Sequence, residues 1–313
     1  MRSITIGSRG SQLALVQAES VKKQLQQAYP RLSIEIRVIK TKGDLILDKT
    51  LDKIGGKGLF VKEIQQALLK EEIDLAVHSM KDVPGISPEG LSMAAVTKRE
   101  DPRDVLVTRE GLTPEELLPG AVIGTSSLRR KAQIRWLNPH CRVVPVRGNV
   151  QTRLKKMEEE GMTGIILAAA GLIRLGMLET LPHAMMATDT FVPAVGQGAL
   201  GCEIRQEDGW MKELLQVLEH DETRCAIRAE RAYIQRLEGD CHVPVGAYGR
   251  LEKGEMVLTG LVACPSGEKR LQETVRGRPG DCEALGLGLA DVMIEKGAKK
   301  LMEAGVCHET DNA

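Results

Sequence analysis

The stretch FVPAVGQGALG, residues 191–201, decides how this chain is divided. Its one proline and three glycines have the density typical of a hinge or of a crossing between domains. The same stretch contains G-x-G-x-x-G at residues 196–201, the pattern of a dinucleotide-binding turn. A proline lies just before that pattern, and the residues after it predict a strand over 199–204 where a dinucleotide site needs a helix. We therefore interpret 191–201 as a hinge or a crossing between domains, and not as a dinucleotide-binding turn.

Two series of alternating strands and helices precede this crossing. Apolar periodicity in the first series predicts strands at 3–7, 33–39 and 73–77 and helices at 11–28 and 60–70. In the second it predicts strands at 104–107, 122–124, 142–146 and 164–168 and helices at 127–137 and 149–160. Such units require mainly parallel sheets with ligand sites at the carboxyl ends of the strands.

The residues after the crossing have a different pattern. A helical run is predicted at 221–237, followed by a glycine-bounded loop through Cys241, strand-like segments as far as Arg276 and an amphipathic helix at 282–296. We expect these last ninety or so residues to form a separate α+β module.

Length and composition limit the class of protein. A chain of 313 residues is expected to form about two domains. Its 43 Lys and Arg balance 43 Asp and Glu, which argues against a protein that coats nucleic acid or a membrane surface. With two Trp, three Tyr and two Phe, the chain also lacks the rings on which single-stranded nucleic acids stack.

The sequence indicates a reducing compartment, and we expect the cytoplasm. MRSITIGSRG, residues 1–10, lacks the apolar stretch of a signal peptide, and the longest apolar run, 165–173, is about half of a membrane span. The seven cysteines contain no C-x-x-C pair and are expected to be reduced thiols. The six histidines and the cysteines show no metal-ligand spacing, so we expect no metal.

The neutral total hides a segment, 121–157, that contains nine Lys or Arg and no acid. Arg129 and Arg130 follow a strand-to-helix junction, and Arg147 stands at the next one, with Arg153 one turn further on. Helix N-termini with arginines favour carboxylates or phosphates. A phosphate loop is excluded, because Gly56-Lys57 lacks the earlier glycine and the Ser or Thr of that motif. A solvated basic face whose acidic partners come from elsewhere in the fold remains the alternative.

Two further residues are candidates for chemistry. Asp82, in HSMKDVP at 78–84, follows a predicted buried strand, where α/β proteins place ligand sites; a turn or helix-capping Asp is the alternative. Cys241, in EGDCHVPVG at 238–246, lies on a loop between modules, where a thiol is well placed as a covalent anchor; an ordinary loop thiol is the alternative.

Eight motifs in order give this chain its resemblance to the porphobilinogen deaminase (hydroxymethylbilane synthase) family. They are RGSQLA at 9–14 with Gln17, GGKGLFVKE at 55–63, HSMKDVP at 78–84, REDPRD at 99–104, GTSSLRR at 124–130, RGN at 147–149 with Arg153, PAVGQG at 193–198 and LEGDCHVP at 237–244. Asp240 departs from the small residue expected before the cysteine, and a carboxylate there should disfavour the thiolate.

The resemblance implies a cytoplasmic, monomeric transferase of haem and tetrapyrrole synthesis. Such an enzyme joins four porphobilinogen molecules head to tail, releases four ammonia and hydrolyses off hydroxymethylbilane, and it carries a covalent dipyrromethane cofactor made from porphobilinogen. The implied fold is α/β: two domains similar to type II periplasmic binding proteins, with mixed, mainly parallel sheets, and a small α+β third domain. The implied boundaries are 1–98 with 194–217 for domain 1, 99–193 for domain 2 and 218–313 for domain 3.

The same resemblance assigns site residues. Asp82 is the implied catalytic residue, since a carboxylate among arginines can stabilise the cation left when ammonia departs and can move a proton. Cys241 would carry the cofactor through a thioether. The other implied cofactor-binding residues are Lys81, Asp82, Thr125, Ser127, Arg129, Arg130, Arg147 and Gly148. The implied substrate-binding residues are Arg9, Ser11, Gln17, Asn149, Arg153, Arg174 and Gln197, and those of a flexible loop are Lys53, Lys57 and Phe60.

Two other classes of protein are alternatives. A non-catalytic binding protein for a small anion would share the first two domains, but the cysteine loop, the third module and the missing signal peptide count against it. A nucleic-acid binder that uses the basic segment is disfavoured by the neutral charge and the few aromatic rings. Porphobilinogen and bound polypyrrole chains, with neither nucleic acid nor membrane, are the partners that we expect.

Overall fold

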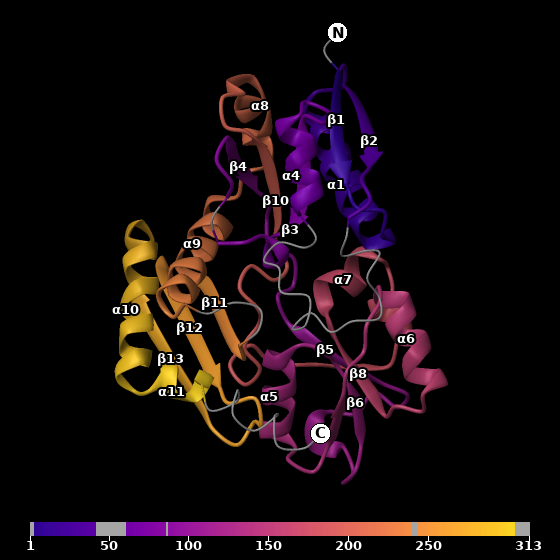
Figure 1. Ribbon diagram of the computed structural model, residues 1–313, viewed down its shortest axis with the longest axis vertical. Coiled ribbons are helices and arrows are strands. Elements are labelled where there is room, and N and C mark those ends of the chain that lie inside the picture. Colours follow the sequence, from indigo (N-terminus) through magenta and orange to yellow (C-terminus); the bar gives the residue numbers. More distant parts are fainter. Residues whose placement is uncertain (1–2, 42–60, 86, 239–242, 304–313) are drawn as a thin grey trace. The chain divides into compact units, whose positions relative to one another are not determined.

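The computed structural model describes residues 3–41, 61–85, 87–238 and 243–303. The chain forms two compact units, which are described separately (Figure 1). The first unit contains residues 1–100 and 198–224, and the second contains residues 101–197 and 225–313. The finer division into three domains stays a prediction.

A five-stranded sheet forms the centre of the first unit, in the order β2-β1-β3-β10-β4. The strands are β1 (Ser3–Ser8), β2 (Ser33–Val38), β3 (Leu75–Ser79), β4 (Leu91–Val96) and β10 (Leu200–Arg205). Strands β1, β2 and β3 are parallel, and β10 is antiparallel to both of its neighbours, so β4 runs in the same direction as the first three. One reversed strand in a parallel set confirms the expected mixed, mainly parallel sheet.

Each face of this sheet has its own apolar core. Helices α1 (Gln12–Ala28) and α8 (Gly209–Leu214), with the 3-10 turn η4 (Leu215–Leu218), pack on the face that presents Leu75 and Val77. Helix α4 (Lys62–Leu69) packs on the opposite face, against Ile73 and Ala76. The alternation of β3 between the two cores is the two-residue period of a strand with both faces buried.

The second unit contains a sheet of the same design, in the order β7-β6-β8-β5-β9. Its strands are β5 (Asp104–Thr108), β6 (Val122–Gly124), β7 (Arg142–Val144), β8 (Gly164–Ala168) and β9 (His183–Met185), with β5 as the reversed strand. Helices α6 (Val150–Glu159) and α7 (Ala169–Arg174) cover one face, and α5 (Leu128–Leu137) covers the other. Short 3-10 turns, η2 (Pro114–Glu116) and η3 (Leu178–Thr180), complete the connections.

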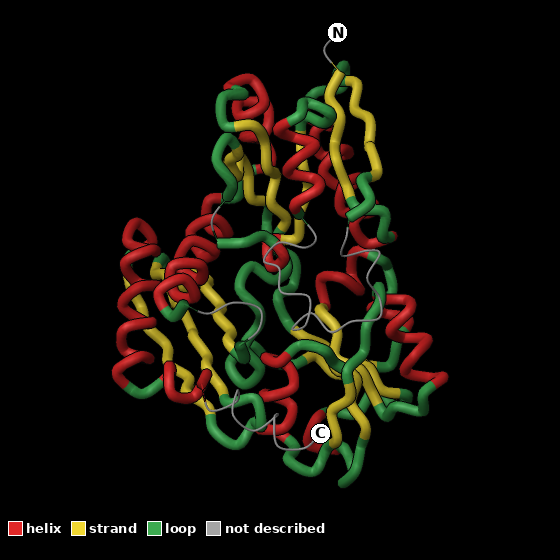
Figure 2. The backbone as a smooth tube through the Cα atoms, in the orientation of Figure 1, coloured by secondary structure: helices red, strands yellow, loops and turns green. Residues whose placement is uncertain are grey.

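The last part of the second unit is the expected α+β module (Figure 2). The antiparallel strands β11 (Val245–Glu252), β12 (Glu255–Ala263) and β13 (Arg270–Gly277) share one core with helices α9 (Asp221–Arg236), α10 (Cys282–Glu295) and α11 (Ala298–Glu303). The 3-10 turn η5 (Pro279–Asp281) leads into α10. A Cβ on Gly286 of α10 would lie 2.2 Å from the carbonyl oxygen of Ala229, so only glycine allows α9 and α10 to approach this closely.

Residues 191–201 are confirmed as a crossing segment, one of three places where the chain passes between the two units, at 100–101, 197–198 and 224–225. The chain leaves the first unit after β4 and returns to it through β10. The two segments run side by side, because the amide nitrogen of Glu100 donates to the carbonyl of Gly198 at 3.1 Å. Gly198 has a φ of +93°, and a Cβ there would lie 2.4 Å from the Glu100 carbonyl oxygen. The glycines of G-x-G-x-x-G therefore serve a close backbone approach, which agrees with rejecting a dinucleotide turn.

The predicted strand 73–77 is shifted, because β3 spans 75–79. Residues 76–79 pair with residues 200–203 of β10, which is more than 120 positions away in the sequence. Local periodicity could not show this pairing. As a result His78 and Ser79 belong to the strand, and the turn that carries Asp82 begins directly after it as the 3-10 turn η1 (Met80–Asp82).

Tyr233 provides a test of the third module's core. The side chain is fully buried against Gly260, and its hydroxyl has no hydrogen-bond partner among the described residues. Burial also raises the pKa of the hydroxyl. Because an unpaired buried hydroxyl costs about 1–3 kcal/mol, Tyr233→Phe should leave the free energy of unfolding unchanged or raise it by about 1 kcal/mol in urea titrations. The same change at the exposed Tyr29 is the control, and a clear loss of stability in Tyr233→Phe would contradict this packing.

Candidate active site

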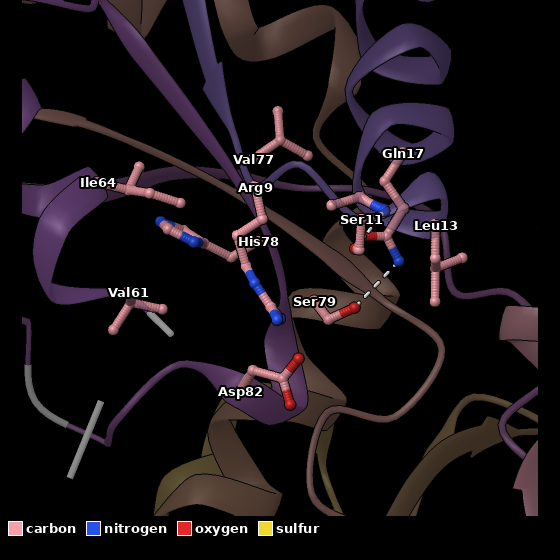
Figure 3. Close-up of a pocket in the computed structure, with 11 residues that line it drawn as sticks. Arg9, Ser11, Leu13, Gln17, Val61, Ile64, Val77, His78, Ser79 and Asp82 are labelled. Atoms are coloured by element: carbon pink, nitrogen blue, oxygen red, sulfur yellow. Dashed lines mark hydrogen bonds between the residues drawn. The ribbon is translucent and has the colours of Figure 1, made fainter. Parts of the chain in front are cut away.

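A pocket in the first unit brings together residues from the ends of β1 and β3 and the start of α1 (Figure 3). Its cavity volume is about 60 Å³, and it opens onto solvent. Its lining consists of Arg9, Ser11, Leu13, Ala14, Gln17, Val61, Ile64, Val77, His78, Ser79 and Asp82. Four residues named from the sequence, Arg9, Ser11, Gln17 and Asp82, thus lie in one place.

Helix α1 supplies hydrogen-bond donors and hydroxyl groups to this pocket. Ser11 is its N-cap and accepts a hydrogen bond from the backbone nitrogen of Ala14 at 3.3 Å. Gln17 is buried and donates from Nε2 to Ser79 Oγ at 3.0 Å, which ties the helix to the end of β3. The first turn of α1 contains no acid, so its N-terminus favours an anion.

Asp82 stands at the end of η1 and is exposed at the pocket. The turn is held from behind, because Met80 is buried and its backbone nitrogen donates to the Ala199 carbonyl at 3.0 Å. No hydrogen bond to the Asp82 carboxylate is found among the described residues, so nothing there supports the alternative of a capping Asp. Figure 3 shows the Arg9 guanidinium directed toward this carboxylate. Lys81 precedes Asp82 in the same turn.

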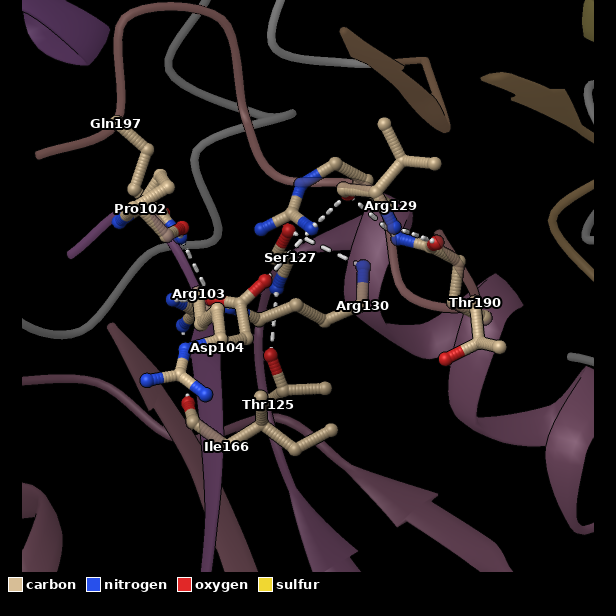
Figure 4. Close-up of polar contacts among 12 residues, drawn as sticks. Pro102, Arg103, Asp104, Thr125, Ser127, Arg129, Arg130, Ile166, Thr190 and Gln197 are labelled. Carbon is tan, nitrogen blue, oxygen red and sulfur yellow. Dashed lines mark hydrogen bonds and ion pairs between the residues drawn. The ribbon is translucent and has the colours of Figure 1, made fainter. Parts of the chain in front are cut away.

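A second polar cluster lies in the second unit, where α5 begins (Figure 4). Asp104, the first residue of β5, is fully buried and forms ion pairs with Arg129 Nη1 at 2.8 Å and with Arg130 Nη2 at 2.7 Å. Gln197 Nε2 donates to the same carboxylate at 3.0 Å. Arg129 and Arg130 are only 5% and 6% exposed. Their acidic partner comes from outside 121–157, as in the alternative interpretation, but their burial shows that these two arginines are not part of a solvated face.

The charges in this cluster do not cancel. Burial on its own raises the pKa of Asp104, but the charges of Arg129 and Arg130 outweigh it and lower the pKa to about 2. Two guanidinium groups therefore share one carboxylate, which leaves one net positive charge among these three buried side chains. Ser127 caps α5 by accepting from the backbone nitrogen of Arg130 at 3.4 Å, and Thr125 Oγ1 accepts from the Ser127 backbone nitrogen at 3.2 Å.

The next strand-to-helix junction, between β7 and α6, also combines a side-chain helix cap with arginines, but its groups are exposed or half-buried. Asn149 caps α6 by accepting from the backbone nitrogen of Thr152 at 2.8 Å. Arg153 Nε donates to the carbonyl of Gly148, whose φ is +118°. Arg147 stands beside them, and the junction adjoins the first one because Thr125 donates from its backbone nitrogen to the Val144 carbonyl at 2.9 Å. The expectation that both arginine-bearing helix starts lie at one sheet edge is confirmed.

Of the other predicted residues, one lies apart from these clusters, one lies in the Asp104 cluster and four fall outside the described residues. Arg174 ends α7. Gln197 is buried, with its amide nitrogen on Asp104 and on the Pro102 carbonyl at 2.7 Å. Cys241, Lys53, Lys57 and Phe60 fall outside the described residues. Within the described part of the chain, no group of three His, Cys, Asp or Glu side chains is arranged to hold a metal ion.

Sequence reasoning missed three residues that the structure places at these sites. Ser79 and His78 line the pocket; both stand in the motif HSMKDVP, but the sequence analysis assigned neither of them a site role. Asp104 is the last residue of the motif REDPRD at 99–104, but the sequence analysis assigned it no role of its own. Its signal was the run of apolar residues after it, since an acid at the start of a buried strand needs a cationic partner.

The comparisons with known proteins agree over nearly the whole chain. Residues 4–213 match the family model "Porphobilinogen deaminase, dipyromethane cofactor binding domain", and residues 224–295 match "Porphobilinogen deaminase, C-terminal domain". The porphobilinogen deaminase of Alkaliphilus metalliredigens is 57% identical over 303 residues, which are 97% of this chain and 96% of that protein. That of Halalkalibacterium halodurans is 49% identical over 97% of each chain.

Among solved structures, the extracellular-binding protein ytmK of Bacillus subtilis is similar over 70% of this chain and 90% of its own, with 10% identity and a TM-score of 0.41. No helix among the described residues is long and apolar enough to cross a membrane. The matched cofactor-binding domain, on a fold of two five-stranded sheets and a three-stranded one, defines the class: a transferase that uses a dipyrromethane cofactor. Specifically, the chain belongs to the porphobilinogen deaminase family.

Asp104 gives a test of the buried cluster. Asp104→Asn leaves two buried guanidinium groups without their counter-charge, so the free energy of unfolding should fall by about 3–5 kcal/mol in urea titrations. Because the folded-state pKa of about 2 lies below the usual value of 3.8, ionised Asp104 stabilises the fold above about pH 4, and that contribution disappears as the pH falls through about 2. It amounts to roughly 2–3 kcal/mol.

The variant should therefore also show a weaker loss of stability between pH 4 and pH 2 than the wild type. Asp101→Asn is the matched control, since Asp101 pairs with the half-exposed Arg103 on the same crossing. A variant at Asp104 that is as stable as this control would contradict the buried ion pairs.

Proposed function

We propose that the pocket of the first unit is where this chain performs the porphobilinogen deaminase reaction, with Asp82 as its catalytic carboxylate. The activity follows from the family: four porphobilinogen molecules are condensed head to tail with release of four ammonia, and hydrolysis yields hydroxymethylbilane for tetrapyrrole synthesis. The observation that carries the residue assignment is an exposed carboxylate on a turn anchored from behind, with Arg9 and the start of α1 beside it.

The polar groups of the pocket suit a pyrrole that bears an acetate and a propionate. Arg9, the Ser11 hydroxyl and the amide of Gln17 can bind carboxylates, as can the N-terminus of α1. Asp82 can accept a hydrogen bond from the pyrrole N–H and stabilise the positive charge that develops when ammonia leaves. The same carboxylate can take the proton that each condensation releases. We propose Asn149, Arg153, Arg174 and Gln197 as further substrate-binding residues.

The cofactor of the family is dipyrromethane, and the groups on this chain fit its acidic side chains. The cluster of Arg129 and Arg130 has one positive charge in excess of Asp104, and the adjoining junction adds Arg147. Bound there, the cofactor supplies the pyrrole carbon to which the first substrate is joined. We propose that Cys241 holds it through a thioether and that these residues contact it: Lys81, Asp82, Thr125, Ser127, Arg129, Arg130, Arg147 and Gly148.

We further propose that the enzyme acts as a monomer in the cytoplasm, without nucleic-acid or membrane partners. The balanced charge and the scarcity of aromatic residues support this. Lys53, Lys57 and Phe60 are proposed to belong to a flexible loop, with support from their place around the glycines at 55–58 in a motif shared with the family. The proposed domains are 1–98 with 194–217, 99–193 and 218–313.

Asp82→Asn tests the central assignment. The change keeps the size of the side chain and removes its charge, so turnover should fall by about 10²–10³-fold, the usual scale for losing an electrostatic or proton-transfer group. Asp82→Glu should retain more activity. The measurement is single-turnover ammonia release by cofactor-loaded protein, with Asp74→Asn, which lies in the same unit away from the pocket, as the control. Ammonia release by Asp82→Asn within a few-fold of wild type would remove Asp82 from the mechanism.

Cys241→Ser tests the site of cofactor attachment. A serine hydroxyl is a poor substitute for a thiolate nucleophile, so the variant should lack the mass of two linked pyrrole units and should be inactive. Measurement of the intact mass checks this. The control variant Cys225→Ser should keep the additional mass of the two pyrrole units. If the additional mass is found on a peptide that does not contain Cys241, the assignment is wrong. If the wild-type protein has only the mass of its amino-acid sequence, a non-catalytic binding protein is favoured.

A further inference from the structure

The core between the sheet of the first unit and α4 contains a fully buried carboxylate. Glu203 lies in the middle of β10 and has no exposed surface. Its sequence neighbours Cys202 and Ile204 pack into the core on the α1 side, so Glu203 projects to the α4 side, where it contacts Gln65 and where the apolar core contains Ile64, Leu68 and Ala76. Placing a charged group in such surroundings costs several kcal/mol unless it is paired.

Two buried side chains bind this carboxylate. Gln65, on α4, donates from Nε2 to both carboxylate oxygens, at 3.1 and 3.2 Å. His78, on β3, approaches Oε2 with Nε2 at 3.0 Å. Each partner is only 5% exposed. Glu203 therefore joins three elements of the first unit: β10, α4 and β3.

The bond between His78 and Glu203 depends on which ring nitrogen of His78 carries a proton. Gln65 donates to both carboxylate oxygens, as it can to an ionised carboxylate, whose two oxygens only accept. An ionised carboxylate cannot donate, so the bond to His78 requires a proton on Nε2. A carboxylate that orients an imidazole in this way is a recurrent arrangement in enzyme sites, where it fixes both the tautomer and the ring position.

His78 is also part of the pocket wall, and the chain continues from it into the catalytic turn. Ser79 follows it, then buried Met80, then Asp82 at the end of η1. The backbone of β10 holds the same stretch, since His78 pairs with Gly201 and Ser79 with Leu200. A Cβ on Gly201 would lie 2.4 Å from Met80 Sδ, so β10 packs tightly beneath the turn. The position of Asp82 thus depends on how β3 and β10 meet.

We propose that Glu203 is a positioning residue for the reaction: acting through His78, it holds the end of β3 and the η1 turn so that Ser79 and Asp82 face the pocket. This inference rests on the proposed role of that pocket. Stability alone does not account for the arrangement, since replacing a buried ionic group and its partners by apolar side chains of similar volume is often neutral or stabilising. The polar cluster lies where it supports the catalytic turn.

The proposal separates stability from turnover, and one variant tests that separation. A triple variant replaces the three polar side chains together, by Gln65→Met, His78→Phe and Glu203→Met. No polar side chain of the cluster is then left buried without a hydrogen-bond partner. The cofactor-loaded triple variant should unfold at or above the wild-type temperature, while kcat falls by about 10–100-fold and KM changes by less than about threefold. A core that serves packing alone would not lower kcat in a protein of full stability.

Glu203→Gln provides a second, milder measurement. The amide that replaces the carboxylate keeps its volume and can still hydrogen-bond, but it no longer requires a proton on His78 Nε2. The ¹⁵N signals of the His78 ring, assigned by their loss in His78→Gln, should change from a form with a proton on Nε2 to a mixture, and kcat should fall by about 3–10-fold. Ile204→Val, a conservative change on the opposite face of the same strand, should leave both kcat and the His78 signals unchanged.

The outcomes distinguish this proposal from the one on which it rests. A stable, cofactor-loaded triple variant with wild-type kcat overturns the role of Glu203. If the triple variant does not fold, Glu203→Gln decides: unchanged kcat and unchanged ring signals overturn the proposal, and the changes described above support it. Full activity of Asp82→Asn would instead overturn the catalytic role of Asp82. The η1 turn that Glu203 holds in place would then have no catalytic residue.

Discussion

The buried carboxylate of Asp104 is the interaction on which the second unit depends. It lies at the first residue of β5, where the chain enters that unit, and it binds the start of α5 through Arg129 and Arg130. Gln197, on the returning segment, donates to the same group. One acidic side chain thus joins the incoming chain, a helix N-terminus and the outgoing chain. Such a group is stable only because several donors meet it at once.

The first unit uses the same physical device at a different place. Glu203 lies in the reversed strand β10, as Asp104 lies in the reversed strand β5, and each carboxylate is fully buried among donors from other elements. Glu230 on α9 is a third example, since it accepts from the backbone nitrogens of Gly196 at 2.6 Å and Gly249 at 2.8 Å. In each case a carboxylate takes up donors that apolar packing would leave unpaired. Polar groups on separate elements are thereby fixed relative to one another, which a site with many ionic contacts requires.

The two kinds of arginine in the basic segment now have different physical roles. Arg129 and Arg130 are buried and share Asp104, so they hold positive charge at a fixed place and can respond little to solvent. Arg147 and Arg153 are only partly buried, beside an exposed helix cap. In the function proposed above, a chain that lengthens by one acidic ring at a time would contact both rigid and adaptable cations. The segment 121–157 contains both kinds because its two helix starts differ in burial: the first packs on Asp104, and the second lies at the surface.

The amino-acid sequence by itself determined the class of the fold, most helix and strand positions, the crossing at 191–201 and the family. These follow from local periodicity, from glycine and proline placement and from motifs in order, all of which are written along the chain. The sequence also named Asp82 and the pocket residues Arg9, Ser11 and Gln17 as site residues. Only the tertiary structure decided that Arg129 and Arg130 are buried on Asp104, that β3 extends to Ser79, and that Glu203 supports His78. Each of these depends on contacts between residues from about 25 to more than 120 positions apart, and such contacts leave no periodic trace in a single sequence.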